Sequence, residues 1–361
     1  MKILHIHTSL ASGGIEAMIC SLANEMVKTE NVSVCSIFNP KDSDVFWNKL
    51  SLCVHRISLG KLKEGFSIAE IFKIYALIKK EKFDVVNLHG FFYYYALTIL
   101  FLHKRVRFFY TVHSDAEMEN RSWDKYFFSL KKIFFKLNWL KPITISDFSK
   151  ESFTKLYKTD SKLIYNGVSK PVITPDDILK PYRITFRTKL FIHAGRISYE
   201  KNQLVLCKVF KRLIEEQHDV VLLIAGNVQD NDIYNDMKAF FTDRIIYLGE
   251  RNNIPQLMSN CDAMCLPSIW EGLPVTLLES LSVGCVPICS AVGGIPNVIT
   301  NGENGLLSKT YSEQEYYDTI KHYLSLSKET LNVMKKKCIK SFETYDINNC
   351  CKKYLNYYNG L

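Results

Sequence analysis

Short apolar runs alternate with longer amphipathic stretches along most of the chain. The runs "KILHIHT", "VSVCSIF", "DVVNLHG" and "RFFYTVHS" are rich in β-branched and aromatic residues, which is typical of buried strands. Between them lie stretches with apolar residues at helical spacing, such as "IEAMICSLANEMVK" and "IAEIFKIYALIKK". This alternation predicts βαβ units, and therefore a parallel sheet with helices on both faces.

The alternation is interrupted once, which predicts two domains. After Val168 the stretch "SKPVITPDDILKPYRITF" carries three prolines and no strong period, so it is typical of a linker. The pattern then restarts with "KLFIHAGR" and "VVLLIAGN". We expect an α/β protein with two Rossmann-like doubly wound domains. The predicted boundaries are 1–168 for the first domain, 169–186 for the linker, 187–344 for the second domain and 345–361 for a last helix.

The composition is compatible with two globular domains. The chain has 361 residues, of which 47% are hydrophobic and 23% charged, so two cores can be buried. No apolar run approaches the roughly 20 residues of a membrane span. The start, "MKILHIHTSL", lacks the apolar core of a signal peptide, so we expect a cytoplasmic protein. The net charge of +9 suggests an anionic partner, which could be nucleic acid, acidic lipid or a phosphorylated small molecule.

The cysteines and two acidic strings leave a metal site open as a minor alternative. Eleven cysteines, an odd number, without a CxxC pair argue against a disulfide framework or a redox motif. CxxxC pairs could bind zinc, and DxD strings can hold a metal–nucleotide complex in a different architecture. The chain has two of each: Cys261/Cys265, Cys285/Cys289, Asp42/Asp44 and Asp230/Asp232. Burial in strands is the preferred interpretation of the cysteines, and a place in polar, loop-like stretches is that of the acids.

Glycines and cations follow several of the predicted strands. In open parallel sheets, ligands bind beyond the carboxyl ends of the strands, where backbone N–H groups and helix N-termini point outward. Gly13 and Gly14 follow the first strand and precede a helix, which lets the backbone approach a phosphate. Arg196 and Lys201 lie in the loop after the first strand of the second domain. The alternative for the two glycines is a plain tight turn, and the alternative for the two cations is a solvated basic loop.

The stretch "EGLPVTLLES" carries two glutamates, Glu271 and Glu279, around an apolar run. Pro274 suits the first turn of a helix, so Glu271 lies in the loop before that helix and Glu279 inside it. Both carboxylates are then expected at the carboxyl edge of the sheet. The alternative is a helix whose acids face water. His113 and Gly293 also follow predicted strands and are expected at such edges.

These motifs, in this order, resemble the retaining glycosyltransferases of family 4, which have the GT-B fold. The most specific part is the E-x7-E motif of "EGLPVTLLES", followed by "GCVPICSAVGGIPNVITNGENGLL". "GGIEA", "ISDFSKESF", "IYNGV" and the GRxxxxKN string from Gly195 to Asn202 add to it. The resemblance covers nearly the whole chain. It implies two domains facing a cleft, with the last helix returning to the first domain.

The resemblance implies a donor site in the second domain. Glu279 would bind the ribose hydroxyls of a nucleotide-sugar, and Glu271 would contact the donor sugar and help position the reacting centre. Arg196 and Lys201 would hold the diphosphate. Gly272 and Leu273 would complete the donor-binding loop.

The resemblance also implies contributions from the first domain. Gly13 and Gly14 would let the N-terminal loop close over the diphosphate, and His113 matches the family's histidine near the donor sugar. The chain departs from the family at Ser114 and at Asn297, where aspartate and glutamate are common. The first departure leaves the identity of the sugar open.

The expected function is transfer of a hexose or N-acetylhexosamine from a nucleoside-diphosphate sugar, with UDP preferred. The acceptor would be a glycan or lipid-linked glycan of a bacterial surface polysaccharide such as capsule or O-antigen. Neither a metal nor another cofactor is expected, and the chain has no known nucleic-acid-binding motif. The alternatives are a GT-B epimerase or phosphorylase, and a non-catalytic nucleotide-sugar-binding protein.

Residues 121–142 suggest contact with the inner face of the plasma membrane. A basic helix with an aromatic face can lie on an anionic membrane. The cations are Arg121, Lys125, Lys131, Lys132, Lys136 and Lys141. The apolar residues at helical spacing are Trp123, Phe127, Leu130, Phe134 and Leu137. The alternative is an ordinary helix packed on the sheet with its lysines in water.

Overall fold

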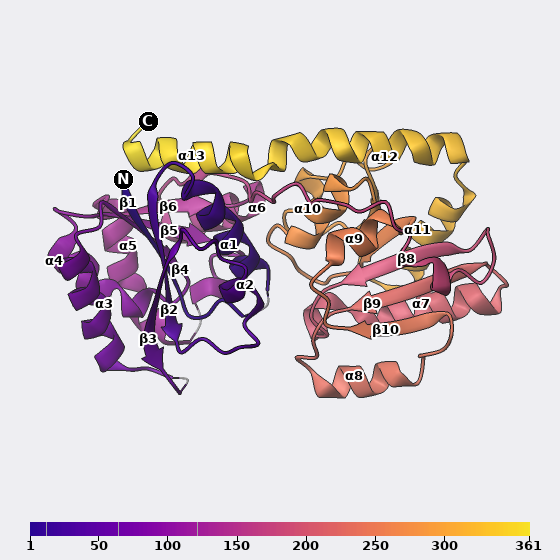
Figure 1. Cartoon of the computed structure of the whole chain (residues 1–361), viewed down its shortest axis with the longest axis horizontal. Helices are drawn as coiled ribbons and strands as arrows, with labels where there is room; N and C mark the ends of the chain where they lie inside the picture. Colours follow the sequence, from indigo (N-terminus) through magenta and orange to yellow (C-terminus); the bar gives the residue numbers. More distant parts are fainter. Residues whose placement is uncertain (12, 64, 121) are drawn as a thin grey trace. The chain divides into compact units, whose positions relative to one another are not determined.

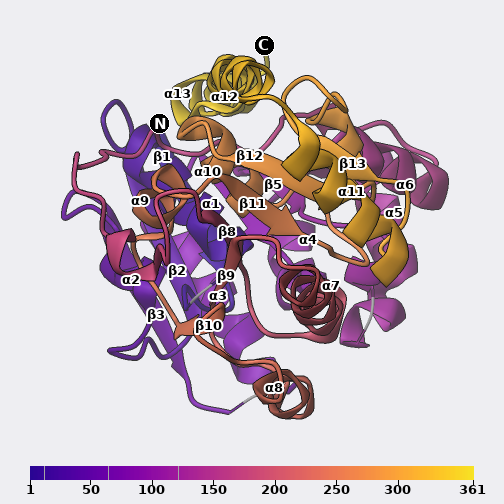
Figure 2. The same ribbon diagram turned by 90° about the vertical axis from the view of Figure 1, so that its right-hand side faces the viewer.

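The computed structural model describes residues 1–11, 13–63, 65–120 and 122–361, which divide into two compact units. The first unit comprises Met1–Ser169 and Asp346–Leu361, and the second comprises Lys170–Tyr345. Each is built on a parallel sheet with helices packed on it, as the strand–helix alternation predicts (Figures 1 and 2). The stretch 169–186 holds one short 3-10 helix, Lys180–Tyr182, and no strand.

The sheet of the first unit has seven parallel strands in the order β3-β2-β1-β4-β5-β6-β7. Strands are added on one side of β1 up to β3 and on its other side from β4 onward. The loops after β1 and β4 therefore diverge at this switch point, where open parallel sheets bind ligands. The strands are β1 (Lys2–His7), β2 (Asn31–Phe38), β3 (His55–Lys61), β4 (Val85–His89), β5 (Arg107–Val112), β6 (Leu140–Thr144) and β7 (Lys162–Leu163).

Two buried clusters cover the two faces of this sheet. One packs under α3 (Ile68–Glu81), α4 (Ala96–Leu102), α5 (Phe128–Lys136) and α6 (Asp147–Tyr157). The other packs under α1 (Gly14–Met26), α2 (Val45–Asn48) and α13 (Ile347–Asn359). Short 3-10 helices span Phe92–Tyr94, Met118–Asn120 and Ser122–Phe127.

Helix α13 belongs to the first unit although it follows the second unit in the chain. It packs against α1 (Figure 1), and its side chains Cys350, Tyr354 and Tyr358 are buried. A Cβ atom at Gly167 would lie 2.5 Å from the Cβ atom of Cys350, so only glycine fits below the helix. The strand-like pairing of Val168 with Asp346 sets the two connections to the second unit side by side.

The sheet of the second unit has six parallel strands in the order β10-β9-β8-β11-β12-β13. Its switch point lies between β8 and β11, so the loops after these two strands flank the place where a ligand is expected. The strands are β8 (Lys189–Ala194), β9 (Val220–Ala225), β10 (Ile245–Gly249), β11 (Ala263–Leu266), β12 (Val286–Ser290) and β13 (Leu306–Ser308).

The helices of the second unit form two groups. Helix α10 packs against α9 and α12, and α7 packs against α8 and α11. The helices are α7 (Gln203–Glu215), α8 (Asn231–Lys238), α9 (Ile254–Ser259), α10 (Val275–Ser282), α11 (Glu313–Ser325) and α12 (Lys328–Phe342). Further 3-10 helices span Tyr199–Lys201, Ile295–Asn297 and Glu343–Tyr345.

The cysteines and the acidic strings have structural roles. Every cysteine is a free thiol, and all except Cys53 are buried. Burial raises the pKa of the Cys265 thiol, on β11, to about 12. Asp230 caps α8 by accepting hydrogen bonds from the backbone N–H groups of Asp232 and Ile233. Asp44 accepts from the N–H of Lys41. Over the described ranges, no group of three or more histidine, cysteine or acidic side chains could hold a metal ion.

Candidate functional site

The switch point of the second unit brings Lys201 and Glu271 into contact. Lys201 follows β8 and Glu271 follows β11, and the Lys201 Nζ atom lies 2.6 Å from Glu271 Oε1. The hydroxyl of Ser268 donates to the same oxygen at 2.7 Å. The two charged side chains are only 15% and 9% exposed, so water screens their attraction weakly. The site therefore holds a cation and an anion in fixed positions at the carboxyl edge of the sheet.

Hydrogen bonds join the two loops that carry this pair. The side-chain amide of Asn202 donates to the carbonyl of Pro267 at 3.1 Å, and the N–H of Ile269 donates to the carbonyl of Glu200 at 2.8 Å. Asn202 adopts the left-handed backbone conformation, with φ of 58°. That conformation turns the chain from the 3-10 helix into α7. The position of Lys201 relative to Glu271 is thus set by backbone contacts as well as by charge.

The loop after β12 packs directly onto the backbone of Glu271. Gly293 has a φ of +55°, and a Cβ atom there would lie 1.7 Å from the carbonyl oxygen of Glu271. The N–H of Gly294 donates to the carbonyl of Gly272 at 2.8 Å. Only glycine permits this approach. The loops after β8, β11 and β12 therefore meet at Glu271.

Gly293→Ala should therefore disrupt the site. The methyl group would collide with the backbone of Glu271, and the two loops would have to move apart. We expect a loss of more than about 2 kcal/mol of unfolding free energy. Urea unfolding measures it. Gly302→Ala is the matched control, because Gly302 also has a positive φ, +81°, but its Cβ would meet nothing within 4 Å. Equal losses in the two variants would show that the close contact is unimportant.

Two residues that sequence reasoning missed support the loop after β8. The amide nitrogen of Gln203 contacts the carbonyl oxygen of Arg196 at 2.5 Å and His193 Nε2 at 3.1 Å. His193 Nδ1 lies 2.9 Å from the carbonyl of Cys265, which can only accept, so Nδ1 carries the proton and Nε2 accepts from Gln203. Burial lowers the pKa of His193 to about 4 and keeps it neutral. The signal in the sequence was the polar Gln203 on the buried side of a predicted helix.

The remaining predicted residues of this unit lie in the loop after β8 and in or before α10. Arg196 is exposed, and its guanidinium lies 3.8 Å from Glu200 Oε1. Glu279 is half-buried on the second turn of α10, as predicted for a residue inside that helix. Gly272 is half-buried and Leu273 is buried in the loop before α10. The structure brings Lys201 and Glu271 together, and leaves Arg196 available on the surface.

In the first unit, His113 ends a row of buried histidines. It follows β5, and its Nε2 atom lies 2.9 Å from Nδ1 of His89, the last residue of β4. His89 Nε2 lies 3.2 Å from Nδ1 of His5 on β1. His7 Nδ1 lies 2.9 Å from the carbonyl of His89. Sequence reasoning identified only His113. The strand order β1-β4-β5 is what places the other three beside it.

A buried carboxylate holds the backbone at His113. Glu119 accepts hydrogen bonds from the N–H groups of His113 and Ser114, the second at 3.0 Å. It also accepts from the hydroxyl of Tyr110 at 3.3 Å. Burial raises the pKa of Glu119, while the nearby Lys131 ammonium opposes that change. The loop that carries His113 is therefore anchored to the interior of its own unit.

The glycines of the N-terminal loop lie next to the same strand ends. Gly13 has an extended backbone and precedes Gly14, the first residue of α1. A Cβ at Gly13 would lie 2.4 Å from Glu16 Oε2, and the other carboxylate oxygen of Glu16 is 3.9 Å from His7 Nε2. Glycine thus leaves room for Glu16 to reach back towards β1.

The predicted membrane helix is oriented differently from our expectation. Lys131 does not face outward, because it is 1% exposed and its Nζ atom lies 4.0 Å from the centre of the Tyr110 ring. The opposite charges of Asp124 and Glu119 partly offset the burial of its ammonium. Phe134 is also buried. The interpretation of Lys131 and Phe134 as membrane-facing was therefore wrong. Arg121 lies outside the described residues.

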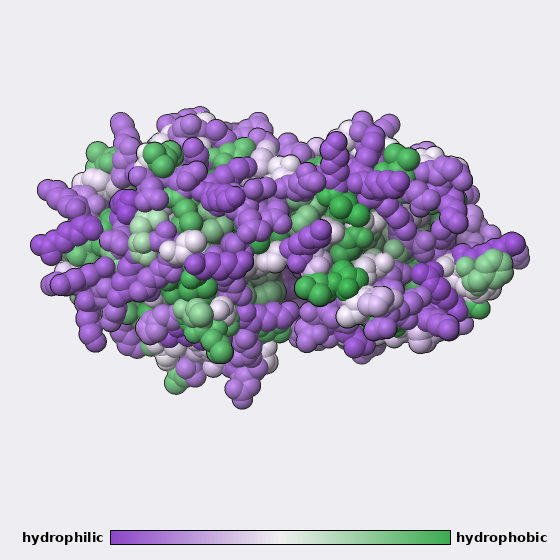
Figure 3. Space-filling view, turned by 45° about the horizontal axis from the view of Figure 1, so that its top comes forward, coloured by the Kyte–Doolittle hydropathy of each residue, from purple (hydrophilic) through white to green (hydrophobic). Residues whose placement is uncertain are grey.

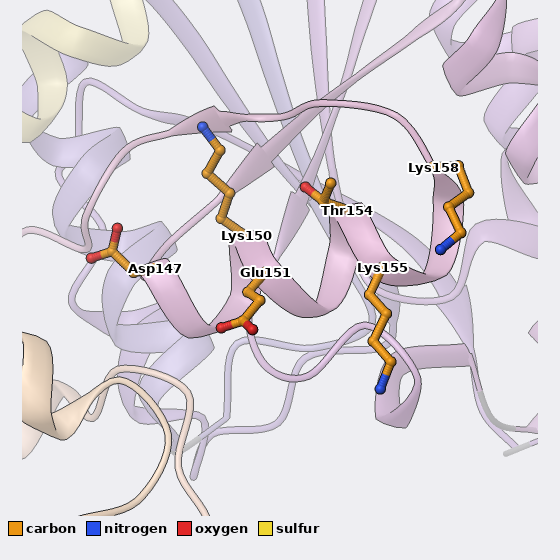
Figure 4. A pocket seen from close by; sticks show the side chains of 6 residues that line it. All are labelled: Asp147, Lys150, Glu151, Thr154, Lys155 and Lys158. Carbon is orange, nitrogen blue, oxygen red and sulfur yellow. The ribbon is translucent and has the colours of Figure 1, made fainter.

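A surface hollow lies along α6. It is lined by Asp147, Lys150, Glu151, Thr154, Lys155 and Lys158 (Figure 4). All six come from one helix and its C-cap, and most are exposed. Lys150 already pairs with Asp160 at 3.3 Å. The hollow gathers none of the residues singled out above.

Comparison with known families covers most of the chain. Residues 12–170 match the family described as Glycosyltransferase Family 4. Residues 176–341 match the family described as Glycosyl transferases group 1. The two matches meet near the boundary between the two units.

Two similar proteins are bacterial glycosyltransferases. UDP-Gal:alpha-D-GlcNAc-diphosphoundecaprenol alpha-1,3-galactosyltransferase of Escherichia coli is 29% identical over 344 residues, which are 89% of this chain and 82% of that protein. The capsular polysaccharide biosynthesis glycosyltransferase CapH of Staphylococcus aureus is 25% identical, over 81% of this chain and 82% of its own. Among solved structures, Anabaena HepE in complex with UDP has a TM-score of 0.80 at 18% identity, covering 100% of both chains.

Proposed function

Because the chain belongs to glycosyltransferase family 4, and so is a glycosyltransferase with the GT-B fold, we propose that it takes a hexose or N-acetylhexosamine from a UDP-sugar and passes it, with retention of configuration, to a lipid-linked glycan. The name of the Escherichia coli relative supports both choices, since it specifies UDP-galactose and a diphosphoundecaprenol-linked acceptor. CapH supports a role in surface polysaccharide synthesis.

The contact of Lys201 with Glu271 carries this proposal. At 2.6 Å, beside the N-terminus of α10, the pair offers a cation for a diphosphate and a carboxylate for sugar hydroxyls. We assign Lys201 and the exposed Arg196 to the diphosphate, Glu271 to the sugar and Glu279 to the ribose. Gly13, Gly14, Gly272 and Leu273 complete the proposed donor-binding set.

In the proposed reaction the bond between the anomeric carbon and the diphosphate oxygen breaks, the oxygen of an acceptor hydroxyl bonds to that carbon, and the hydroxyl proton passes to the leaving diphosphate. The transition state resembles an oxocarbenium ion. Negative charge then grows on the leaving diphosphate, where Lys201 and Arg196 stabilise it more strongly than in the bound substrate. These two cations take the place of a metal ion in our proposal.

Glu279→Ala tests the donor assignment. If the carboxylate accepts both ribose hydroxyls, its loss should weaken UDP binding by about 1.5–3 kcal/mol, the range for hydrogen bonds to a charged group. Titration calorimetry with UDP measures this directly. Glu313→Ala, at an exposed position of α11, is the control. Unchanged UDP affinity in the Glu279 variant would remove it from the site.

Product analysis separates transfer from the alternative activities. An epimerase of the same fold would convert the donor without an acceptor, and a binding protein would leave it intact. Mass spectrometry of reactions with and without a polyprenol-diphosphate sugar should show a glycosylated product only when the acceptor is present.

We further propose that the first unit contacts an anionic membrane through an aromatic patch made of Phe66, Trp123 and Tyr126. These side chains are 37%, 44% and 70% exposed. The ring centres of Phe66 and Trp123 lie 4.9 Å apart, and those of Trp123 and Tyr126 lie 5.7 Å apart. Lys63 and Lys125 are exposed, and Lys125 Nζ lies 5.0 Å from the centre of the Tyr126 ring. Aromatic rings with neighbouring lysines suit the headgroup region. A lipid-linked acceptor would be met there.

The face of the molecule drawn in Figure 3 suits a contact of limited extent. On the face drawn in Figure 3, hydrophilic side chains predominate and hydrophobic ones occur in small groups. Within the described part of the chain, no helix is both long and apolar enough to cross a membrane.

The Trp123→Ala/Tyr126→Ala double variant should lose most of its binding to vesicles that contain phosphatidylglycerol. Each lysine near the surface contributes about 1 kcal/mol, so Lys125→Glu should act in the same direction and binding should weaken with salt. Co-sedimentation at low and physiological salt measures this. Phe186→Ala, which removes an exposed aromatic side chain beside Arg187 in the second unit, is the control. Equal sedimentation with neutral and anionic vesicles would contradict the proposal.

A further inference from the structure

The row of histidines in the first unit is connected ring to ring. His5 Nδ1 lies 3.2 Å from His89 Nε2, and His89 Nδ1 lies 2.9 Å from His113 Nε2. The rings of His5 and His89 are inclined by 24°, and those of His89 and His113 by 35°. His5 and His89 are fully buried, whereas His113 remains 7% exposed. The row thus runs from the interior of the sheet to its carboxyl edge.

All three rings are held neutral. Burial lowers the pKa of His5 to about 4 and that of His113 to about 3, and it lowers the pKa of His89 well below the usual value. A neutral imidazole has one N–H donor and one bare nitrogen acceptor. The two contacts can therefore exist only if the protons all point the same way along the row.

The inner end of the row decides between the two directions. His5 Nε2 is buried and has no hydrogen-bond partner among the described residues. If the donors pointed inward, this atom would carry an N–H group without an acceptor, which is rare in protein interiors. If they point outward, the atom is a bare acceptor, and an under-used acceptor is tolerated more often. The outward direction leaves His113 with its proton on Nδ1.

We propose that His89, backed by His5, is a positioning residue that fixes His113 as the Nδ1–H tautomer, so that His113 presents a hydrogen-bond donor to an oxygen of the donor sugar. This inference rests on the proposed function for the identity of the ligand. Among the described residues, His113 Nδ1 makes no hydrogen bond of its own. Glu119 holds the backbone N–H of His113, so the ring and the main chain are fixed from different sides.

The tautomer can be measured without substrate. Long-range proton–nitrogen correlation spectra of the full chain, labelled with nitrogen-15 in histidine, distinguish Nδ1–H from Nε2–H at pH 7.5. The His113→Ala spectrum identifies the His113 signals by their absence. We expect the Nδ1–H form in the wild type. In His89→Phe, which removes the partner, His113 should become a mixture of tautomers. In His89→Asn, whose amide can still donate to His113 Nε2, the Nδ1–H form should persist.

Kinetics provide the second readout. His89→Phe should lower kcat for sugar transfer about tenfold with a small change in donor KM, the size of one lost hydrogen bond in the transition state. His89→Asn should restore most of it. In a His113→Ala background, His89→Phe should cause no further loss, because His89 acts through His113.

Two results would overturn the inference. One is an Nε2–H tautomer of His113 in the wild type, and the other is an unchanged His113 tautomer in His89→Phe. If the protein transferred no sugar at all, the proposed function would fail while the spectra would still decide the tautomer. Folding of each variant is checked by circular dichroism. The wild-type tautomer can be measured even if the His89 variants fail to fold.

Discussion

Lys201→Ala should lower kcat about a hundredfold or more while changing donor KM much less. The lysine lies 2.6 Å from Glu271 and is only 15% exposed, so its charge acts on the diphosphate through little water. Charge on the leaving group is larger in the transition state than in the bound donor, and removal of one preorganised group commonly costs this much. Steady-state kinetics with varied donor measure both constants, in the presence of EDTA, which should leave wild-type activity largely intact.

The same variant should also be less stable, by about 3 kcal/mol. It leaves the Glu271 carboxylate, 9% exposed, without its cation and with the Ser268 hydroxyl as a hydrogen-bond donor. Lys201→Ala/Glu271→Gln should regain much of that stability but none of the activity, which separates the two effects. Lys211→Ala, on the exposed side of α7, is the control for loss of a lysine. If the Lys201 variant raised KM alone, the lysine would only bind the donor.

Acid should destabilise the first unit well before its ordinary carboxylates are protonated. The pKa of His5 is lowered to about 4 and that of His113 to about 3, from 6.5 in the unfolded chain. Above pH 6.5 neither state binds these protons and stability does not change. Below it only the unfolded chain binds them, so each histidine costs about 1.4 kcal/mol per pH unit until its folded pKa is reached.

Urea unfolding at pH 7.5 and 5.0 measures this loss. In a Trp270→Phe background, tryptophan fluorescence reports on the first unit, because the other three tryptophans lie there. His5→Asn should reduce the loss by about 2 kcal/mol. The exposed His55 of the same unit is the control, and His55→Asn should change nothing. The raised pKa of Glu119 acts in the opposite direction, so the variants are compared with each other. If His5→Asn and His55→Asn lost the same unfolding free energy between pH 7.5 and 5.0, the acid sensitivity could not be assigned to His5.

The sequence was sufficient to place the candidate residues on their loops. Strands that alternate with helices must be parallel, and the loop after each strand must then reach the carboxyl edge. This reasoning positioned Glu271 before α10, Glu279 inside it and Lys201 after β8. It could not predict that Lys201 touches Glu271, because that depends on β8 and β11 being neighbours in the sheet. Strand order is a tertiary property, which the short-range periodicity of a sequence does not reveal.

Buried polar groups were the main source of error. Lys131 belonged to a run of lysines and was expected at the surface, facing either a membrane or water. Its burial depends on Asp124 and Glu119, whose charges approach it only after the preceding 3-10 segments fold back. Gln203 and His89 were missed for a related reason. Their hydrogen-bond partners are loop carbonyls and other rings, which no spacing in the sequence reveals.

The place of α13 in the chain has a consequence for biosynthesis. The helix covers part of the first unit's buried surface, yet it is translated only after all of residues 170–345. Domains usually fold in the order in which they leave the ribosome. Here the whole of the second unit is synthesised before the last helix of the first unit, so the second unit can complete its fold earlier. The first unit must wait with part of one apolar face of its sheet uncovered, which makes it the part of the nascent protein that a chaperone would have to protect.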